Sequence, residues 1–268
     1  MKKNNYWAVR MAEAAQKSTN KTISATNKQL AKYYRSCQER VINDFISLYN
    51  ELLAQTKNSV KPTPADLYKL DKYWQLQGQL QNELTKLGDK STKAMSKWFE
   101  KEFVKAYEDF ALPGGDNFTT LVEPNAKQMI NQIWCADGKS WSDRVWNNTA
   151  ELQSTLNEKL IHCVTTGKKT SQLKAALQER FGVSYHQAET LVRTEMAHIE
   201  TQAALSRYRD YGINEIEILA DDSCSDCGKY DGKRFPINEN PVPFHPNCRC
   251  CVIPVIKYIK GGSNNDNN

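Results

Sequence analysis

The sequence has no apolar run near the ~20 residues that a helix needs to cross a bilayer. Its mean hydropathy is -0.68. The first 16 residues are basic but contain no apolar segment of the kind that signal peptides carry. We therefore expect neither a membrane span nor secretion, and we expect synthesis in a reducing cytosol.

The sequence also has little net charge, a formal +5, and that charge is unevenly placed. Residues 1–112 hold 19 Lys and Arg against 12 Asp and Glu, whereas residues 113–268 hold 17 against 19. The excess in the first part permits weak binding of DNA without sequence preference, because phosphate contacts carry no base information. It does not require a polyanionic partner.

Helical periodicity is the strongest structural signal, and it is clear over residues 26–55. Apolar residues recur there at spacings of three and four, which is the stripe of one long helix. The stripe consists of Leu30, Tyr34, Cys37, Val41, Phe45, Leu48 and Leu52. Pro62 and Pro64 end the pattern, and Thr63 is placed to cap a second helix that starts at Pro64.

The second helix is predicted over residues 64–87, ending at Gly88-Asp89, and a third over residues 95–110. The second stripe consists of Leu67, Leu70, Trp74, Gln77, Leu80, Leu84 and Leu87, and the third of Met95, Trp98, Phe99, Phe103, Ala106 and Phe110. Residues 1–112 are thus predicted to be an arm of long antiparallel helices with coiled-coil-like seams. Tyr6, Trp7, Tyr33 and Tyr73 are expected at its surface, available to a partner.

The turn Leu112-Pro-Gly-Gly-Asp116 is the best domain boundary, because composition and charge balance change there. Helices are predicted after it over about 124–135, 141–165, 170–181 and 184–211. Gly167, Gly182 and Gly212 stand where C-cap glycines belong. Ser184 with Gln187 has the spacing of a capping box.

Three short strands are predicted near the C-terminus, over residues 213–219, 233–235 and 251–255. The fold class is therefore mainly α, with a small α+β C-terminal part in which an antiparallel sheet surrounds a cysteine cluster. Residues 113–260 are expected to form this second domain. Residues 261–268 have nothing to bury and are expected to be a disordered tail.

Five of the eight cysteines fall within residues 224–251, which in an unsecreted chain indicates metal binding before disulfides. Cys224-Ser-Asp-Cys227 and His245-Pro-Asn-Cys248 share a two-residue gap that turns two side chains toward one ion. Two such knuckles supply the Cys3His set of a closed structural zinc site. One zinc ion is therefore expected, and it would stabilise folding without activating water.

Five candidate ligands compete for four places: Cys224, Cys227, His245, Cys248 and Cys250. In an extended chain Cys248 and Cys250 point to one face and Cys251 to the other, so Cys251 is expected to be a small core residue. Cys248 is preferred because it completes the second knuckle, and Cys250 stays open as its substitute.

Enzymatic readings of these residues are disfavoured. A redox pair at Cys224 and Cys227 would need a βαβ setting, whereas an Asp-Gly turn follows. A nuclease of the His-Asn-His type needs a second histidine or asparagine near a bound phosphate, and only His245 lies beyond residue 198. Arg193 and Glu195 could suggest ADP-ribosyl transfer, but no nicotinamide-binding pattern accompanies them. We therefore expect no enzymatic activity.

Several motifs taken in order resemble the Mu F-like head morphogenesis family of phage minor head proteins. Residues 120–256 carry most of the resemblance, and the N-terminal Tyr6-Trp7-x-x-Arg10 is similar to members from phages and prophages of Gram-positive bacteria. The motifs are Leu191-Val-Arg-Thr-Glu195, Tyr208, Gly212, Asp221-Asp222, Cys224-x-x-Cys227, Asp231-Gly-Lys-Arg-Phe235 and Pro243-Phe-His-Pro-Asn-Cys-Arg-Cys250.

The resemblance implies a minor capsid protein of the virion, made in the cytoplasm of a bacterial host. Its implied partners are the portal and other head proteins, and its implied roles are head morphogenesis and, in some relatives, DNA packaging or ejection. The alternative is a nucleic-acid-binding zinc protein that acts outside a virion. Residues 221–250 disfavour that alternative, because their four Lys and Arg stand against five Asp and Glu.

Arg193 and Glu195 are two positions apart on a helix, so they point in different directions and reach separate partners. Arg193 is expected to anchor its helix through Asp221, Asp222 or a backbone carbonyl, since guanidinium groups make bidentate bonds well. The functional alternative for this pair is a contact with DNA or with the portal.

Overall fold

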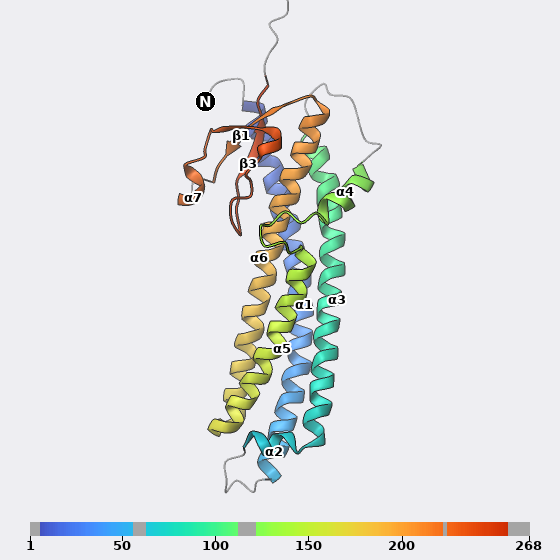
Figure 1. The fold of residues 1–268 in the computed structure, drawn as a ribbon, viewed down its shortest axis with the longest axis vertical. Helices are drawn as coiled ribbons and strands as arrows, with labels where there is room; N and C mark the ends of the chain where they lie inside the picture. Colours follow the sequence, from blue (N-terminus) through green and yellow to red (C-terminus); the bar gives the residue numbers. More distant parts are fainter. Residues whose placement is uncertain (1–5, 56–62, 112–121, 222–223, 257–268) are drawn as a thin grey trace, which may run out of the picture.

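The protein is an elongated bundle of long helices with a small sheet at one end (Figure 1). A computed structural model describes residues 6–55, 63–111, 122–221 and 224–256, and side chains are described from residue 126 within the third of these ranges. Four helices, α1 (Tyr6–Gln55), α3 (Asp71–Asp109), α5 (Trp141–Thr166) and α6 (Thr170–Asp210), run alternately down and up the long axis. We call these four helices the bundle.

Helix α1 is one helix of 50 residues, and it begins twenty positions before the predicted start at residue 26. The earlier part keeps the spacing of three and four, but most of its buried positions hold small or polar residues, Ala8, Ala12, Ala15 and Thr19, before Ile23. A stripe built mainly from alanine and threonine gives a weak hydrophobic signal, which explains why residues 6–25 were not predicted as helix. Tyr6 and Trp7 are exposed, as expected.

The predicted helix over residues 64–87 is interrupted near its start. Thr63 does cap a helix, with a reciprocal capping box to Asp66, but α2 (Pro64–Tyr68) ends after five residues and α3 begins at Asp71. This break shifts the stripe by one position. Tyr73 is therefore buried and Trp74 is 60% exposed, the reverse of the prediction for each.

Helix α3 also runs through Gly88, where a helix end was predicted. Leu84, Leu87, Ser91 and Met95 keep the buried stripe continuous across this point. Gly88 is required by a close approach: a Cβ built there would lie 2.5 Å from a ring carbon of Trp146 on α5. The glycine thus makes room for an aromatic ring between two helices.

Gly88→Ala is expected to lower the free energy of unfolding by about 1 kcal/mol, because displacing the Trp146 ring outweighs the gain in helix propensity. Gly78→Ala is the matched control on the same helix, since a Cβ there meets nothing within 4 Å. It should raise stability by ~0.5–1 kcal/mol. Urea unfolding of both variants measures the difference, and the same sign for both would contradict the role of Trp146.

The second half of the chain contributes α4 (Val122–Ile130), α5 and α6. Helix α4 ends five residues earlier than predicted, whereas α5 has nearly the predicted bounds and ends on Gly167 in the left-handed region, φ 62°. The two helices predicted over 170–181 and 184–211 are one helix, α6, of 41 residues.

Gly182 therefore ends no helix, and Ser184 caps none. Ser184 is buried inside α6, where its hydroxyl donates to Oδ1 of Asn148 at 2.8 Å, and its backbone carbonyl accepts from the same amide at 2.9 Å. This bond to α5 occupies the polar group that was expected to cap a helix. Gly212 does follow the end of α6, with φ 67°, as predicted.

The sheet has the order β2-β1-β3 and is antiparallel throughout. Its strands are β1 (Glu215–Leu219), β2 (Arg234–Pro236) and β3 (Cys251–Pro254), close to the predicted positions. In β1 the alternating Ile216 and Ile218 are buried. The two short helices α7 (Ser225–Gly228) and η2 (Ile237–Glu239) lie in the connections. We call the described part of residues 213–256 the sheet module.

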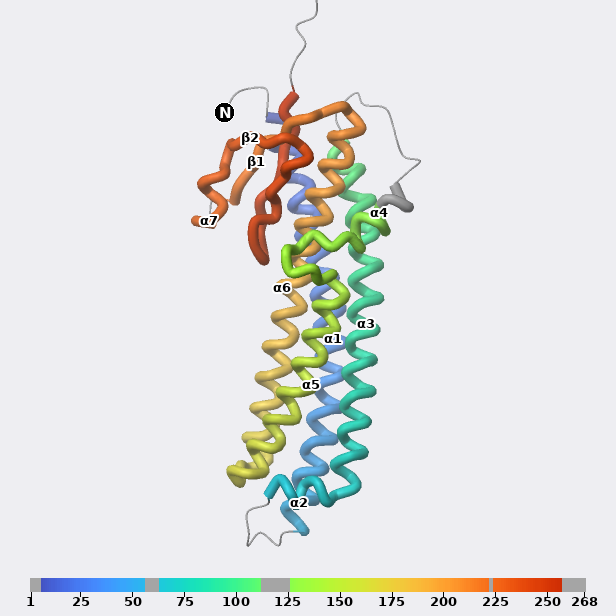
Figure 2. Tube along the Cα trace, viewed as in Figure 1, coloured from blue at the N-terminus to red at the C-terminus, as the bar shows by residue number. Residues whose placement is uncertain are grey.

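The sheet module and the bundle share one hydrophobic core. Strand β3 packs against α1 and α6, and the Tyr208 hydroxyl of α6 donates to the backbone carbonyl of Val252 at 3.3 Å. Figure 2 shows the sheet module lying where the start of α1 meets the end of α6. In the described residues, no helix is both long and apolar enough to cross a bilayer. The boundary at residues 112–116 and the tail at 261–268 fall outside the described residues.

Candidate metal centre

The two predicted knuckles face each other in the sheet module. Cys224 precedes α7 and Cys227 lies within it, so one helical turn brings both sulfurs to the same side. The second knuckle closes with the backbone N–H of Cys248 donating to the carbonyl of His245 at 3.1 Å. Asn247 stands between them in the left-handed region, φ 62°, which asparagine tolerates better than most residues.

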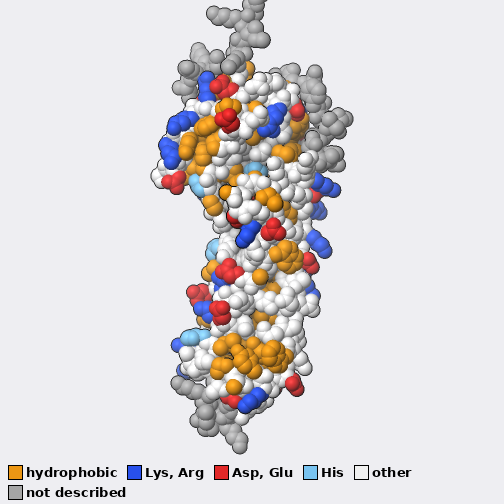
Figure 3. All heavy atoms as spheres, in the orientation of Figure 1, with side chains coloured by type: hydrophobic (Ala, Val, Ile, Leu, Met, Phe, Trp, Pro, Cys, Tyr) orange, Lys and Arg blue, Asp and Glu red, His pale blue; other side chains and the backbone are white. Residues whose placement is uncertain are grey.

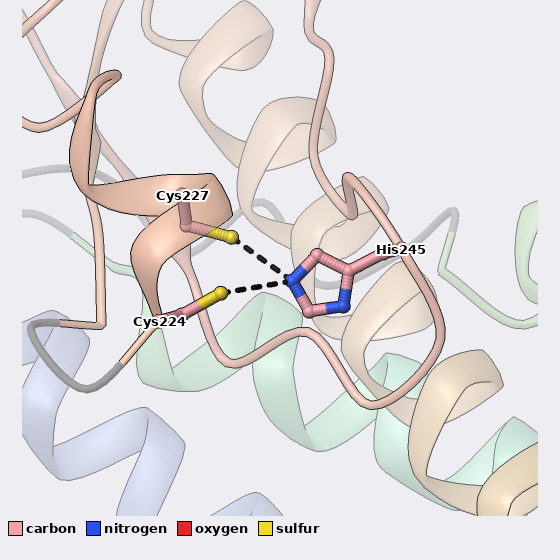
Figure 4. Close-up of side chains that lie close together, drawn as sticks. All are labelled: Cys224, Cys227 and His245. Carbon is pink, nitrogen blue, oxygen red and sulfur yellow. Dashed lines mark hydrogen bonds between the residues drawn. The ribbon is translucent and has the colours of Figure 1, made fainter.

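The imidazole of His245 joins the two knuckles. Its Nε2 lies 3.2 Å from the sulfur of Cys224 and 3.1 Å from the sulfur of Cys227, and Figure 4 shows it pointing between them. The sulfurs of Cys227 and Cys248 are 3.9 Å apart. Cys227 thus belongs to two groups of three, one with Cys224 and His245 and one with Cys248 and Cys250.

These distances fit the donor set of a tetrahedral site. With zinc–sulfur bonds of about 2.3 Å and zinc–nitrogen bonds of about 2.0–2.1 Å, ligand atoms of such a site lie about 3.5–3.8 Å apart. The three observed distances bracket this range. The side chains of Cys227, Cys248 and Cys250 are buried, as the ligands of a closed structural site are. The cluster therefore could hold a metal ion.

The orientation of His245 is fixed by its other ring nitrogen. Nδ1 donates to the backbone carbonyl of Pro246 at 2.7 Å, which leaves Nε2 as the lone-pair nitrogen facing the cysteines. The same bond raises the pKa of the imidazole above its ordinary value. A backbone carbonyl that holds the second nitrogen is the usual outer-shell partner of a metal-binding histidine.

The sulfurs differ in their electrostatic surroundings. A hydrogen bond from the Cys250 thiol lowers the pKa of Cys248 to about 5, and burial raises the pKa of Cys227 to about 12. Burial also raises the pKa of Cys251, which lies outside both groups of three. The Cys251 sulfur lies 3.9 Å from the backbone carbonyl of Leu219 on β1. All eight cysteines are free.

Glu195 and Arg193 do not lie in the metal centre. Glu195 is buried and accepts a hydrogen bond from the Trp134 indole at 3.1 Å, and burial raises its pKa. Arg193 is half-buried beside a cavity of about 30 Å³ that Glu200 also lines. Asp221 pairs with Arg249 at 3.8 Å. Asp222 lies outside the described residues.

Sequence reasoning missed a groove next to the metal centre. It has a volume of about 770 Å³ and lies between α5, α6, the loop after α4 and the segment 240–246 that carries His245. Trp134 and His198 stack in it with ring centroids 4.3 Å apart. The residues come from four separate parts of the chain, so no local pattern in the sequence could have revealed them.

The fold and the cluster together define a mainly helical protein that carries a cysteine- and histidine-rich module able to hold a metal ion. Residues 154–253 match the family model described as Phage Mu protein F like protein. The resemblance to the Mu F-like phage head family is therefore confirmed, on a segment that runs from α5 to β3 and contains all five candidate ligands. Comparisons with curated proteins and with solved structures gave no match.

Proposed function

We propose that the protein is a minor head protein of a phage virion, associated with the portal and acting in head morphogenesis and in DNA packaging or ejection. The observation that carries this proposal is the match of residues 154–253 to the Mu F-like family, because that segment includes the whole metal cluster. Within the proposal, residues 1–112 provide the docking surface for the portal, and the protein has no enzymatic role.

The metal in this proposal is one zinc ion with a structural role. Cys224, Cys227, His245 and Cys248 would hold it, with Cys250 as the competitor for the fourth place. Two observations support this set: the distances of the cluster and the carbonyl that orients His245. Four protein ligands leave no position for water, so the ion would stabilise the fold and activate no nucleophile.

The test is the composition of purified particles. An epitope-tagged full-length chain, expressed during particle production, should co-sediment with capsids at low copy and cross-link to the portal. An exposed aromatic residue provides a finer test of docking: Trp74→Ala should reduce cross-linking, whereas Val183→Ala, at an exposed apolar residue on α6 outside residues 1–112, should not. A chain absent from particles and bound to host nucleic acid would overturn the assignment.

Contact with DNA is the second part of the proposal, and a row of lysines on α3 supports it. Lys86, Lys90, Lys93, Lys97 and Lys101 follow each other at spacings of three and four and are all exposed. They lie on the face opposite the buried stripe, and Figure 3 shows basic side chains along the edge where α3 lies. The row covers about 22 Å of helix at 1.5 Å per residue.

Binding to duplex DNA should be weak, independent of sequence and steeply dependent on salt, because phosphate neutralisation releases counterions. Lys90→Gln with Lys97→Gln is expected to reduce the slope of log affinity against log salt by about 2, since each phosphate contact contributes about 0.9. Lys174→Gln, an exposed lysine on α6, is the control and should leave the slope unchanged. Equal slopes for the unchanged chain, the double variant and the Lys174→Gln control would show that α3 is not the surface that contacts DNA.

A further inference from the structure

The groove beside the metal centre has walls that are polar but almost uncharged. Its charged side chains are largely neutralised by partners: Arg144 pairs with Asp137 at 2.7 Å, Glu151 with Arg180 at 2.8 Å, and Glu195 accepts from Trp134. Lys139 also lines the groove; among the described residues it makes no ion pair, although its charge helps to lower the pKa of the Asp143 carboxyl at the start of α5. A surface this close to neutral is unsuited to a nucleic acid backbone, which needs a basic track.

Hydrogen-bonding capacity is abundant along the groove. The side chains of Asn147, Gln187, Thr190 and Gln202 line it, and none of them has a hydrogen-bond partner within the described part of the chain. Asn147 faces the groove from α5 and the other three from α6. Each amide offers both a donor and an acceptor, which is the pattern that a peptide group needs.

The floor and one end of the groove are apolar and aromatic. Trp134 stacks on His198, whose ring is 6% exposed and whose two nitrogens have no partner in the described residues. The segment 240–246 adds Pro241, Pro243 and Phe244, and Phe244 is itself held in place by stacking on Tyr230. Apolar contacts flanking rows of amides suit a polypeptide better than a small polar solute.

The length of the groove sets the size of the ligand. Gln187 and Gln202 are fifteen positions apart on α6, which is about 22 Å at 1.5 Å per residue. An extended chain rises about 3.3 Å per residue, so this distance accommodates about six or seven residues. Lys139 stands next to the N-terminus of α5, where the helix dipole also favours negative charge.

We infer that this groove binds an extended peptide segment of another protein, about six or seven residues long, with an acidic side chain at the Lys139 end. The amides of Asn147, Gln187 and Gln202 pair with the peptide backbone, and Phe244 and the prolines pack on its side chains. His245 belongs both to the wall of the groove and to the metal cluster, so the two sites are adjacent. The inference does not depend on the virion assignment.

The experiment uses the full-length, metal-loaded chain on an array of random heptapeptides, with fluorescein-labelled hits measured by anisotropy. Asn147→Ala with Gln187→Ala is expected to weaken the hits at least tenfold, because two hydrogen bonds of about 1 kcal/mol each are lost. Gln178→Ala, an exposed amide on α6 outside the groove, should change affinity less than twofold. Lys139→Glu should select against peptides that contain Asp or Glu.

Two results would overturn the inference. One is that the peptides bind the groove variants as tightly as they bind the unchanged chain. The other is binding of oligo(dT) that Lys139→Glu abolishes while no heptapeptide binds, which would assign the groove to single-stranded nucleic acid. Because Asn147 and Gln187 are exposed, their replacement should leave the thermal unfolding midpoint unchanged, so that lost binding is not lost folding. If the chain binds peptides but is absent from particles, the proposed function is refuted and the inference about the groove stands.

Discussion

Replacing Cys227 by serine is expected to release the metal and unfold the sheet module while the bundle stays folded. Cys227 is the residue shared by both groups of three in the cluster, so its loss breaks both groups at once. The sheet has three strands of at most five residues and cannot hold itself together through burial alone. Binding of structural zinc is worth roughly 10–16 kcal/mol in small zinc modules, so the module's folding depends on it.

Elemental analysis and hydrogen exchange together measure this result. The unchanged chain should contain about one zinc per molecule, as expected for a single closed site, and the Cys227→Ser chain much less. The amide of Ile218, which donates to the carbonyl of Lys233, should lose its protection in the variant, whereas amides within α3 should keep theirs. Treatment of the unchanged chain with a chelator should reproduce the pattern.

Cys251→Ser is the matched control, because Cys251 is a buried neighbour in sequence that lies outside the cluster. The Cys251→Ser chain should retain the zinc, and its free energy of unfolding should fall by about 1 kcal/mol because a hydroxyl replaces a buried thiol. Comparing Cys248→Ser with Cys250→Ser then decides the fourth ligand, since the true ligand should release more metal. Equal damage from Cys227→Ser and Cys251→Ser, or a disulfide between Cys224 and Cys227, would contradict the structural zinc site.

A second large effect is expected from Glu200, a buried carboxyl near the end of α6 that adjoins the sheet module. Glu200 on α6 is 7% exposed, and its Oε1 has no partner in the described residues. Burial raises its pKa from 4.5 to about 8, and the nearby carboxylates Glu102 and Asp109 act in the same direction. Glu102 on α3 is also buried and accepts from the hydroxyl of Thr19 on α1 at 2.7 Å. The charge of Lys105 acts in the opposite direction and partly lowers the pKa of Glu200.

The sign of the pH dependence follows from the direction of this shift. Because the folded state holds the proton more tightly than the unfolded state, the free energy of unfolding should fall as pH rises from about 4.5 to about 8. Each pKa unit corresponds to about 1.4 kcal/mol, so the loss amounts to several kcal/mol. Glu200→Gln keeps the shape and removes the titration, and should be more stable than the unchanged chain at pH 8.

Urea unfolding at pH 6 and at pH 8.5 measures the difference between the two chains. Comparison at each pH separates Glu200 from other titrating groups, which both chains share. Glu179→Gln, an exposed carboxyl on the same helix, should follow the unchanged chain at both values. A Glu200→Gln chain that loses stability with pH as steeply as the unchanged chain would show that Glu200 is ionised in the folded state.

The sequence predicted the types of the elements well and their continuity poorly. Periodicity located α5 and the later part of α1, because Leu and Phe mark the buried face there. Glycine misled the prediction twice. Gly88 and Gly182 have the composition of a helix end, but the buried stripe continues on both sides of each, and tertiary contacts with Trp146 and Asn148 favour one helix. These contacts join distant residues, so local rules could not show them.

The candidate metal ligands were accessible from sequence because their chemistry is local. A two-residue gap between ligands constrains the backbone by itself, so Cys224 with Cys227 and His245 with Cys248 could be paired before the fold was known. The relation between Cys248 and Cys250 depends on how the chain enters β3, and the groove depends on four separate segments. Neither follows from spacing alone.

The continuity of α6 gives the molecule a fixed length. One unbroken helix of 41 residues joins the far end of the bundle to the sheet module, and at 1.5 Å per residue it spans about 60 Å. Its neighbours α1 and α3 are of similar length and pack along it, so it cannot bend at a hinge of its own. Two contacts made at opposite ends of this protein are therefore held at a fixed distance. That distance changes only when whole helical turns are added to or removed from every helix of the bundle together.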